Sequence, residues 1–204
     1  MKRRNKIYEM TLLAVLSGII ILMSFTPIGY IKTVGLEITL LVIPVVIGGI
    51  CLGPKGGLIL GTLFGITSFL QCVLGLSTFG AMLFTINPFL DAIVCIIPRA
   101  IMGFLVGVIF NSLNKLFKND IIAHIVSSMA GALLNTILFM SLLCLCFYNT
   151  EYIQSFKTAL GANNVFIFII LFVGTNGLIE LGINFIIGAF VTKTLFVINN
   201  RHKK

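Results

Sequence analysis

Residues 56–90 read GGLILGTLFGITSFLQCVLGLSTFGAMLFTINPFL and contain no Asp, Glu, Lys or Arg. A membrane-spanning helix needs about 20 predominantly apolar residues, so this stretch is long enough to cross a bilayer. Other uncharged stretches of similar character occur along the chain, at 10–31, 38–54, 121–150 and 158–179. The sequence therefore predicts a series of membrane-spanning helices.

The overall composition agrees with this interpretation. Hydrophobic residues make up 58% of the 204 residues and charged residues 10%, and the mean hydropathy is +1.13. Spans and short loops account for nearly the whole chain, which leaves no room for a separate soluble domain. The apolar runs are continuous, whereas the strands of a membrane β-barrel alternate in polarity. We expect an all-α integral membrane protein with one domain over residues 1–204.

A six-transmembrane-helix bundle fits the apolar pattern best. The first span is too long for the core of a secretory signal and lacks a small-x-small cleavage site, so we interpret it as retained. The second span is short and contains Pro44. Proline has no N–H, so neighbouring helices must compensate for the missing backbone hydrogen bond. The expected spans are 8–25, 38–53, 56–76, 88–113, 121–148 and 163–193.

The basic residues indicate the orientation. Cytoplasmic loops of membrane proteins carry an excess of Lys and Arg, and a cytoplasmic N-terminus with six spans puts most basic residues on one side. Lys32 and Lys157 then lie outside, and Arg99 lies within a span. The sequence thus predicts a multi-pass plasma-membrane protein with both termini cytoplasmic. The net charge of +8 is explained by this distribution rather than by nucleic-acid binding. The expected cytoplasmic residues are Lys2, Arg3, Arg4, Lys6, Lys55, Lys115, Lys118, Lys193, Arg201, Lys203 and Lys204.

Enzyme signatures are missing from the sequence. Gly53-Pro54-Lys55-Gly56-Gly57 lacks the spacing of a phosphate-binding loop, and neither histidine belongs to a nucleophilic constellation. The five cysteines are scattered through apolar runs, which predicts free packed thiols rather than disulfides. We therefore expect neither catalysis, nor a cofactor, nor a metal site.

Arg99 is the basic residue that needs a special explanation. An Arg at the centre of a spanning helix costs about 2.5–3.5 kcal/mol on insertion scales, so it requires a partner. One interpretation is a bidentate donor to a ligand carboxylate. The alternative is an internal ion pair with Glu180 or Asp91, or a side chain that extends to the cytoplasmic face.

Three polar residues in the sixth span, Asn176, Glu180 and Asn184, are spaced by four residues and so share one helical face. They are interpreted either as the lining of a polar site or as hydrogen-bonding contacts between helices. Asn135, Asn87 and Thr39 are weaker candidates for the same site. Asn87 precedes Pro88 and has the alternative role of starting the fourth helix.

The first span carries Ala14 and Gly18, a pair of small residues four positions apart. Such a pair allows another helix to approach closely. The partner is either a neighbouring span or another subunit.

Several motifs resemble the substrate-binding S components of energy-coupling factor (ECF) transporters. They are TPIGYI at 26–31, ITLLVIPVVIGGI at 38–50, LGPKGG at 52–57, GTLFGITS at 61–68 and PRAIMG at 98–103. The TPIGYI, IT-x-x-x-IP and FG-x-TS pieces are most similar to pantothenate-type members, although Val42 stands where those chains often have His. The resemblance covers essentially the whole chain.

This resemblance implies a subunit that captures a vitamin at the outer face and joins a transmembrane coupling subunit and two cytoplasmic ATPases. Ala14 and Gly18 then contact the coupling subunit. Independently of the resemblance, residues 26–32 contain Pro, Gly and an aromatic residue, so we expect an outer loop that can fold over the mouth of the bundle. Residues 77–87 and 149–162 are expected as further loops on this outer face. The expected binding residues are Tyr30, Thr39, Asn87, Arg99, Asn135, Asn176, Glu180 and Asn184. Riboflavin or another vitamin is the alternative substrate. A structural membrane subunit or a membrane-embedded enzyme is the alternative class.

Overall fold

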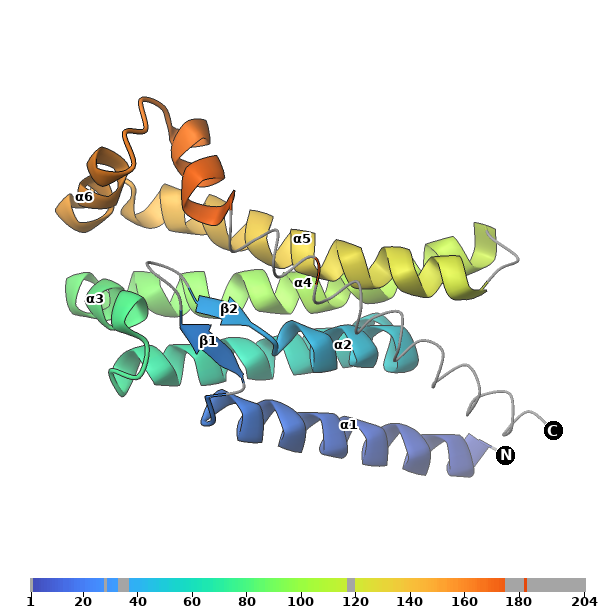
Figure 1. Cartoon of the computed structure of the whole chain (residues 1–204). Helices are drawn as coiled ribbons and strands as arrows, with labels where there is room; N and C mark the ends of the chain where they lie inside the picture. The colour runs from blue at the N-terminus through green and yellow to red at the C-terminus, as the bar shows by residue number, and fades with distance from the viewer. Residues whose placement is uncertain (1, 28, 33–36, 117–119, 175–181, 183–204) are drawn as a thin grey trace.

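The computed structural model describes residues 2–27, 29–32, 37–116, 120–174 and 182, and in these the chain is a bundle of helices with one small hairpin of strands. Figure 1 shows the long helices lying side by side. The elements are α1 (Lys2–Ser24), β1 (Tyr30–Lys32), β2 (Glu37–Thr39), α2 (Val42–Val73), α3 (Thr78–Ile86), α4 (Pro88–Leu116), α5 (Asp120–Phe147), α6 (Glu151–Ala159) and a further apolar helix, Val165–Gly174.

The second predicted span is wrong in its bounds. Residues 37–39 form strand β2, and the helix begins only at Val42. The range of α2 contains one residue without helical geometry, Gly53, with φ 76° and ψ −170°. This conformation is open essentially to glycine alone. The helical piece 42–52 rises about 17 Å at 1.5 Å per residue, well short of the ~30 Å hydrocarbon core.

The segments expected as outer loops, 77–87 and 149–162, contain helices α3 and α6. Each begins with a capping hydroxyl: Ser77 Oγ accepts from the Gly80 amide at 3.3 Å, and Thr150 Oγ1 accepts from the Ile153 amide at 3.5 Å. Ser and Thr at these positions satisfy amides that the first turn leaves without partners. Short helices therefore replace irregular loops at this end.

Four described helices are long and apolar enough to cross a membrane: Lys6–Ser24, Val42–Val73, Pro88–Leu116 and Ile122–Phe147. Many large apolar side chains on them are exposed, among them Leu22, Phe89 and Leu145, as expected for lipid-facing surfaces. The sixth predicted span, 163–193, is described only in part, as the helix Val165–Gly174.

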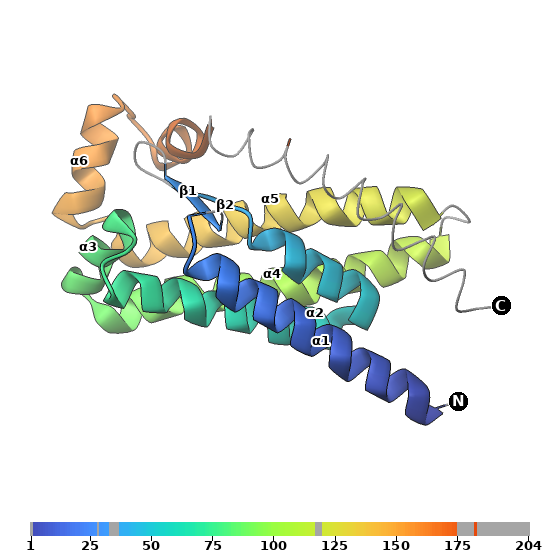
Figure 2. The same cartoon turned by 60° about the horizontal axis from the view of Figure 1, so that its bottom comes forward.

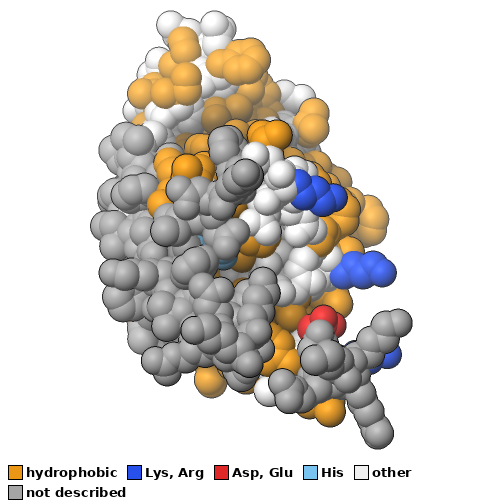
Figure 3. Space-filling model, turned by 90° about the vertical axis from the view of Figure 1, so that its right-hand side faces the viewer, with side chains coloured by type: hydrophobic (Ala, Val, Ile, Leu, Met, Phe, Trp, Pro, Cys, Tyr) orange, Lys and Arg blue, Asp and Glu red, His pale blue; other side chains and the backbone are white. Residues whose placement is uncertain are grey.

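The two ends of the bundle differ in character. The start of α1, the Gly53 turn and the end of α4 lie together at one end, and α3 and α6 lie at the other (Figures 1 and 2). Lys6, Lys55 and Lys115 are exposed residues of the first end. Figure 3 views this end and shows, in its coloured part, Lys or Arg side chains near an acidic side chain and among hydrophobic and other groups.

Helices α2 and α4 approach each other along a seam of glycines. Cβ atoms added at Gly57 and Gly103 would each lie far inside van der Waals contact of the other's carbonyl oxygen. A Cβ at Gly61 would likewise overlap the carbonyl oxygen of Arg99, and one at Gly65 would lie 2.6 Å from the Ile96 Cα. Glycine permits such close approach of two backbones. The seam fixes the position of Arg99 relative to α2.

Candidate functional site

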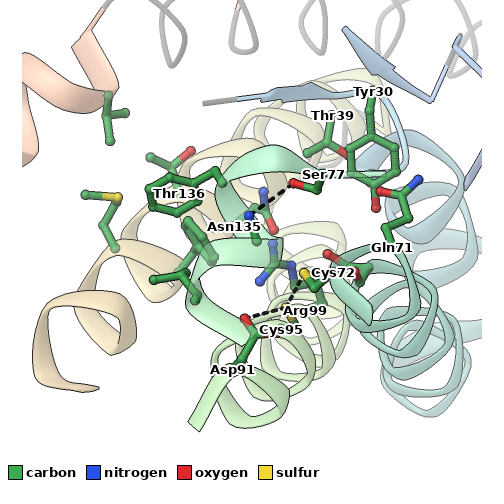
Figure 4. A pocket seen from close by; sticks show the side chains of 17 residues that line it. Tyr30, Thr39, Gln71, Cys72, Ser77, Asp91, Cys95, Arg99, Asn135 and Thr136 are labelled. Atoms are coloured by element: carbon green, nitrogen blue, oxygen red, sulfur yellow. Dashed lines mark hydrogen bonds between the residues drawn. The ribbon is translucent and has the colours of Figure 1, made fainter. Parts of the chain in front are cut away.

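A pocket lies between α2, α3, α4 and α5 (Figure 4). Its lining includes residues of α3, the helix at the end of the bundle opposite the exposed lysines (Figure 1). About 100 Å³ of its interior is available to the centres of water molecules. One water molecule needs about 10–15 Å³ by this measure, so the pocket has room for a small organic molecule. Its lining mixes polar and aromatic side chains.

The strand hairpin supplies Tyr30 and Thr39 to the pocket. These residues face each other in the antiparallel register of β1 and β2. A further hydrogen bond joins the residues next to the two strands: the Leu40 amide donates to the Gly29 carbonyl at 3.0 Å. The segment expected to fold over the bundle mouth thus forms a small sheet that brings two predicted residues together (Figure 4).

Arg99 lines the pocket and is 8% exposed. The preceding residue, Pro98, has no N–H and therefore leaves the Val94 carbonyl without its usual helical donor. Arg99 Nη1 donates to that carbonyl at 2.7 Å. The guanidinium carbon also lies 4.5 Å from the Phe139 ring centroid and 5.6 Å from that of Phe64. The Pro-Arg pair and the two rings hold the guanidinium in place.

Among the described residues, Arg99 forms no ion pair, and its Nε has no hydrogen-bond partner. The alternative pair with Asp91 is therefore not formed, and Glu180 lies outside the described residues. A buried charge without a paired charge is costly. The guanidinium retains donor capacity for an anionic group.

Asp91 is 1% exposed and also lines the pocket. Its Oδ1 lies 3.8 Å from Cys95 Sγ, which donates to it, while Oδ2 has no partner among the described residues. Cys95 Sγ lies 3.8 Å from Cys72 Sγ on α2. All five cysteines are free, which confirms the prediction of unpaired thiols.

Asn135 and Thr136 complete the wall from α5. Asn135 is 5% exposed, and its Oδ1 finds no donor in the described part of the chain. A buried amide oxygen without a donor is an uncommon and costly arrangement. The pocket thus presents unused acceptors on Asp91 and Asn135 beside an unused donor on Arg99.

The predicted binding residues do not all meet. Tyr30, Thr39, Arg99 and Asn135 line the pocket, whereas Asn87 does not. Asn87 Oδ1 accepts from the amides of Phe89 and Leu90, each at 3.1 Å, and so caps α4. The positions of Asn176, Glu180 and Asn184 lie outside the described residues.

Sequence reasoning missed the contribution of α2 and the start of α4. Ser68, Gln71 and Cys72 line the pocket from α2, and Asp91 and Cys95 from α4. A signal was present, because Asp91, Cys95 and Arg99 are spaced by four residues and so share one helix face. The same spacing rule had singled out the stripe in the sixth span.

Comparison with known proteins identifies the family. Residues 8–191 match the family described as "ECF transporter, substrate-specific component". A comparison with curated protein sequences gives no significant match. The match extends over most of the 204 residues and agrees with the apolar spans and the pocket described above. The chain therefore belongs to the substrate-specific component family of ECF transporters.

Proposed function

We propose that this protein captures pantothenate at the outer face of the plasma membrane, as the binding subunit of an ECF-type vitamin importer. Family members bind a small-molecule substrate and work with a membrane coupling subunit and ATPases. The observation that carries the pantothenate proposal is Arg99, a buried guanidinium that lines the pocket without an ion pair among the described residues. Pantothenate carries one carboxylate, which matches a guanidinium in charge and shape.

The remaining groups of pantothenate also have complements in the pocket. Its two hydroxyls and its amide N–H are donors, and Asp91 Oδ2 and Asn135 Oδ1 are buried acceptors without donors among the described residues. Gln71, Ser77 and Thr136 supply further polar contacts around the cavity. Asn176, Glu180 and Asn184 remain proposed contacts. Val42, at the position where pantothenate-type chains often have His, packs in the core outside the pocket lining.

Riboflavin is the second candidate, and the aromatic contacts argue against it. A flavin ring system would be expected to stack on an aromatic side chain of the pocket. The Phe139 ring already lies under the Arg99 guanidinium. Phe79 packs against Tyr152, Phe156 and Phe172, with centroid distances of 5.7–6.0 Å. The two Phe rings of the lining are therefore engaged by the protein, and Tyr30 is the third aromatic side chain there. This arrangement favours a small aliphatic anion.

We further propose six spans with both termini cytoplasmic. The exposed residues Lys6, Lys55 and Lys115 at one end support this orientation. The pocket, α3 and α6 then lie towards the outside, where the substrate arrives.

Calorimetry on the purified protein tests the substrate. We expect pantothenate to bind with a dissociation constant below micromolar and at one molecule per chain. The alcohol analogue, in which a hydroxymethyl group replaces the carboxylate, should bind much more weakly.

Absence of pantothenate binding below micromolar would reject the substrate. A yellow purified protein would point to riboflavin, and binding of no vitamin would favour the structural subunit. Turnover of a lipid or peptide would indicate an enzyme.

The predicted coupling face is open. Ala14 is exposed, and a Cβ added at Gly18 meets nothing within 4 Å in the described structure. We propose that this face of α1 contacts the coupling subunit through close helix packing.

The double variant Ala14→Leu/Gly18→Leu should no longer co-purify with the coupling subunit, while its pantothenate affinity, measured by calorimetry, stays unchanged. Ile137→Trp, at an exposed site on α5, is the control and should assemble normally. Normal assembly of the α1 variant would place the interface elsewhere.

A further inference from the structure

Cys72, Asp91 and Cys95 form a compact group of potential metal ligands, of which the vitamin proposal uses only Asp91. One ligand atom of each lies within 4.8 Å of the others, and all three residues are buried. Cys72 comes from α2 and the other two from successive turns of α4. The group therefore bridges the helices of the glycine seam.

The spacing of the three atoms suits a tetrahedral metal ion. With Zn–S bonds of about 2.3 Å, two thiolates on a tetrahedral Zn²⁺ lie about 3.8 Å apart, and a thiolate and a carboxylate oxygen lie about 3.5 Å apart. The observed Cys72 Sγ–Cys95 Sγ distance is 3.8 Å, and the Cys95 Sγ–Asp91 Oδ1 distance is also 3.8 Å. The third pair, Cys72 and Asp91, has ligand atoms within 4.8 Å of each other, so binding requires these side chains to move closer together.

The charge balance is also favourable. A divalent cation that displaces the protons of both thiols adds two positive and two negative charges. The local net charge does not change, which matters where an uncompensated charge is expensive. Arg99, Cys72 and Cys95 all line the same pocket (Figure 4).

One oxygen of Asp91 is buried without a partner in the described part of the chain, which also points to a ligand. Asp91 is 1% exposed, and its Oδ2 has no hydrogen-bond partner among the described residues. A buried carboxylate oxygen of this kind calls for a donor or a cation. Three protein ligands leave the fourth position of a tetrahedral ion for water or a ligand atom in the pocket.

We propose that Cys72, Asp91 and Cys95 form a binding site for a soft divalent cation, Zn²⁺ or its analogue Cd²⁺, with an open coordination position towards the pocket. Two thiolates and one carboxylate favour these ions over Mg²⁺ or Ca²⁺, which select oxygen ligands. The sequence predicts no metal site because the three residues lie in two different spans.

Cadmium titration of the full-length protein tests this site. Purified protein is kept in detergent with a non-thiol phosphine reductant and without vitamin, and the thiolate-to-cadmium ultraviolet band is followed. We expect saturation at one Cd²⁺ per chain and competition by Zn²⁺. Affinity should fall as pH falls, because binding releases thiol protons.

Three single variants and one control make the assignment specific. Cys72→Ser, Cys95→Ser and Asp91→Asn should each weaken cadmium binding at least about tenfold, the lower bound for loss even of a supporting group at a metal site. The Cys144→Ser/Cys146→Ser control, on α5 outside the pocket, should bind like the wild type. A monodisperse elution profile confirms that each variant is folded.

Absence of a saturable band, or a band unchanged in Cys72→Ser and Cys95→Ser, would overturn the metal site. Pantothenate calorimetry is carried out separately with a chelator present. Failure of one proposal is therefore distinguishable from failure of the other.

Discussion

We expect the Arg99→Met variant to bind pantothenate about 30-fold to several thousand-fold more weakly than the wild type. Truncating one partner of a buried hydrogen-bonded charge pair costs about 2–5 kcal/mol, and each 1.4 kcal/mol is tenfold in affinity. Arg99 is 8% exposed and forms no ion pair with another described residue, so the ligand carboxylate would be left without its counter-charge. Isothermal titration calorimetry measures the effect directly.

A matched background separates binding from folding. Arg99→Met also removes the donor to the Val94 carbonyl, which Pro98 cannot replace. Pro98→Ala restores a backbone N–H for that carbonyl, so Pro98→Ala should bind pantothenate normally, and Pro98→Ala/Arg99→Met should bind weakly while remaining folded.

The neutral alcohol analogue gives the decisive comparison. The alcohol should bind Pro98→Ala and Pro98→Ala/Arg99→Met with similar affinity, because it has no carboxylate for Arg99 to bind. Arg99→Lys should be intermediate, since an ammonium keeps the charge but lacks the planar fork. If the double variant lost the acid and the alcohol equally, Arg99 would have only a structural role.

Arg99 shows what a sequence can predict about this site. A charge inside a span is conspicuous, so its importance follows from the cost of burying it. Its environment does not follow, because the rings of Phe64 and Phe139 come from two other helices. Cys72 and Asp91 are likewise brought together only by the packing of α2 on α4.

The helices and strands are likewise predictable from the sequence only in part. Long apolar runs predict the spans that correspond to α1, α4 and α5, because hydrophobicity and length decide whether a helix inserts into a membrane. The short hairpin of β1 and β2 and the capped helices α3 and α6 depend on local hydrogen bonds. Hydropathy does not report these bonds, so 77–87 and 149–162 are predicted as loops and the start of the second span is misplaced.

The glycine seam follows from a rule that the sequence already contains. Gly57, Gly61 and Gly65 are spaced by four, as are Gly103 and Gly107. This is the spacing that drew attention to Ala14 and Gly18, yet those residues lie on an open face. Spacing identifies a surface able to pack closely, and only the fold decides whether a neighbouring helix fills it.

We expect Gly57→Ala to lower the free energy of unfolding by about 3 kcal/mol, the upper part of the range for overpacked sites. The added Cβ would overlap the Gly103 carbonyl oxygen, and backbone cannot rotate away as a side chain can. For a chain of this size the midpoint of thermal unfolding should fall by about 6–12 °C, measured by circular dichroism in detergent. Separation of α2 from α4 should also weaken pantothenate binding, since both helices line the pocket.

Two comparisons distinguish a close-packing effect from a general response to replacing glycine. Gly103→Ala should have a similar cost, because its Cβ would overlap the Gly57 carbonyl oxygen in turn. Gly18→Ala should not lower the midpoint, since its Cβ meets nothing within 4 Å and alanine favours helix by about 1 kcal/mol over glycine. An unchanged midpoint in Gly57→Ala and Gly103→Ala would mean that α2 and α4 are farther apart than the seam requires. The Cys72–Cys95 contact would then also be lost, because the same approach of the two helices brings those sulfurs together.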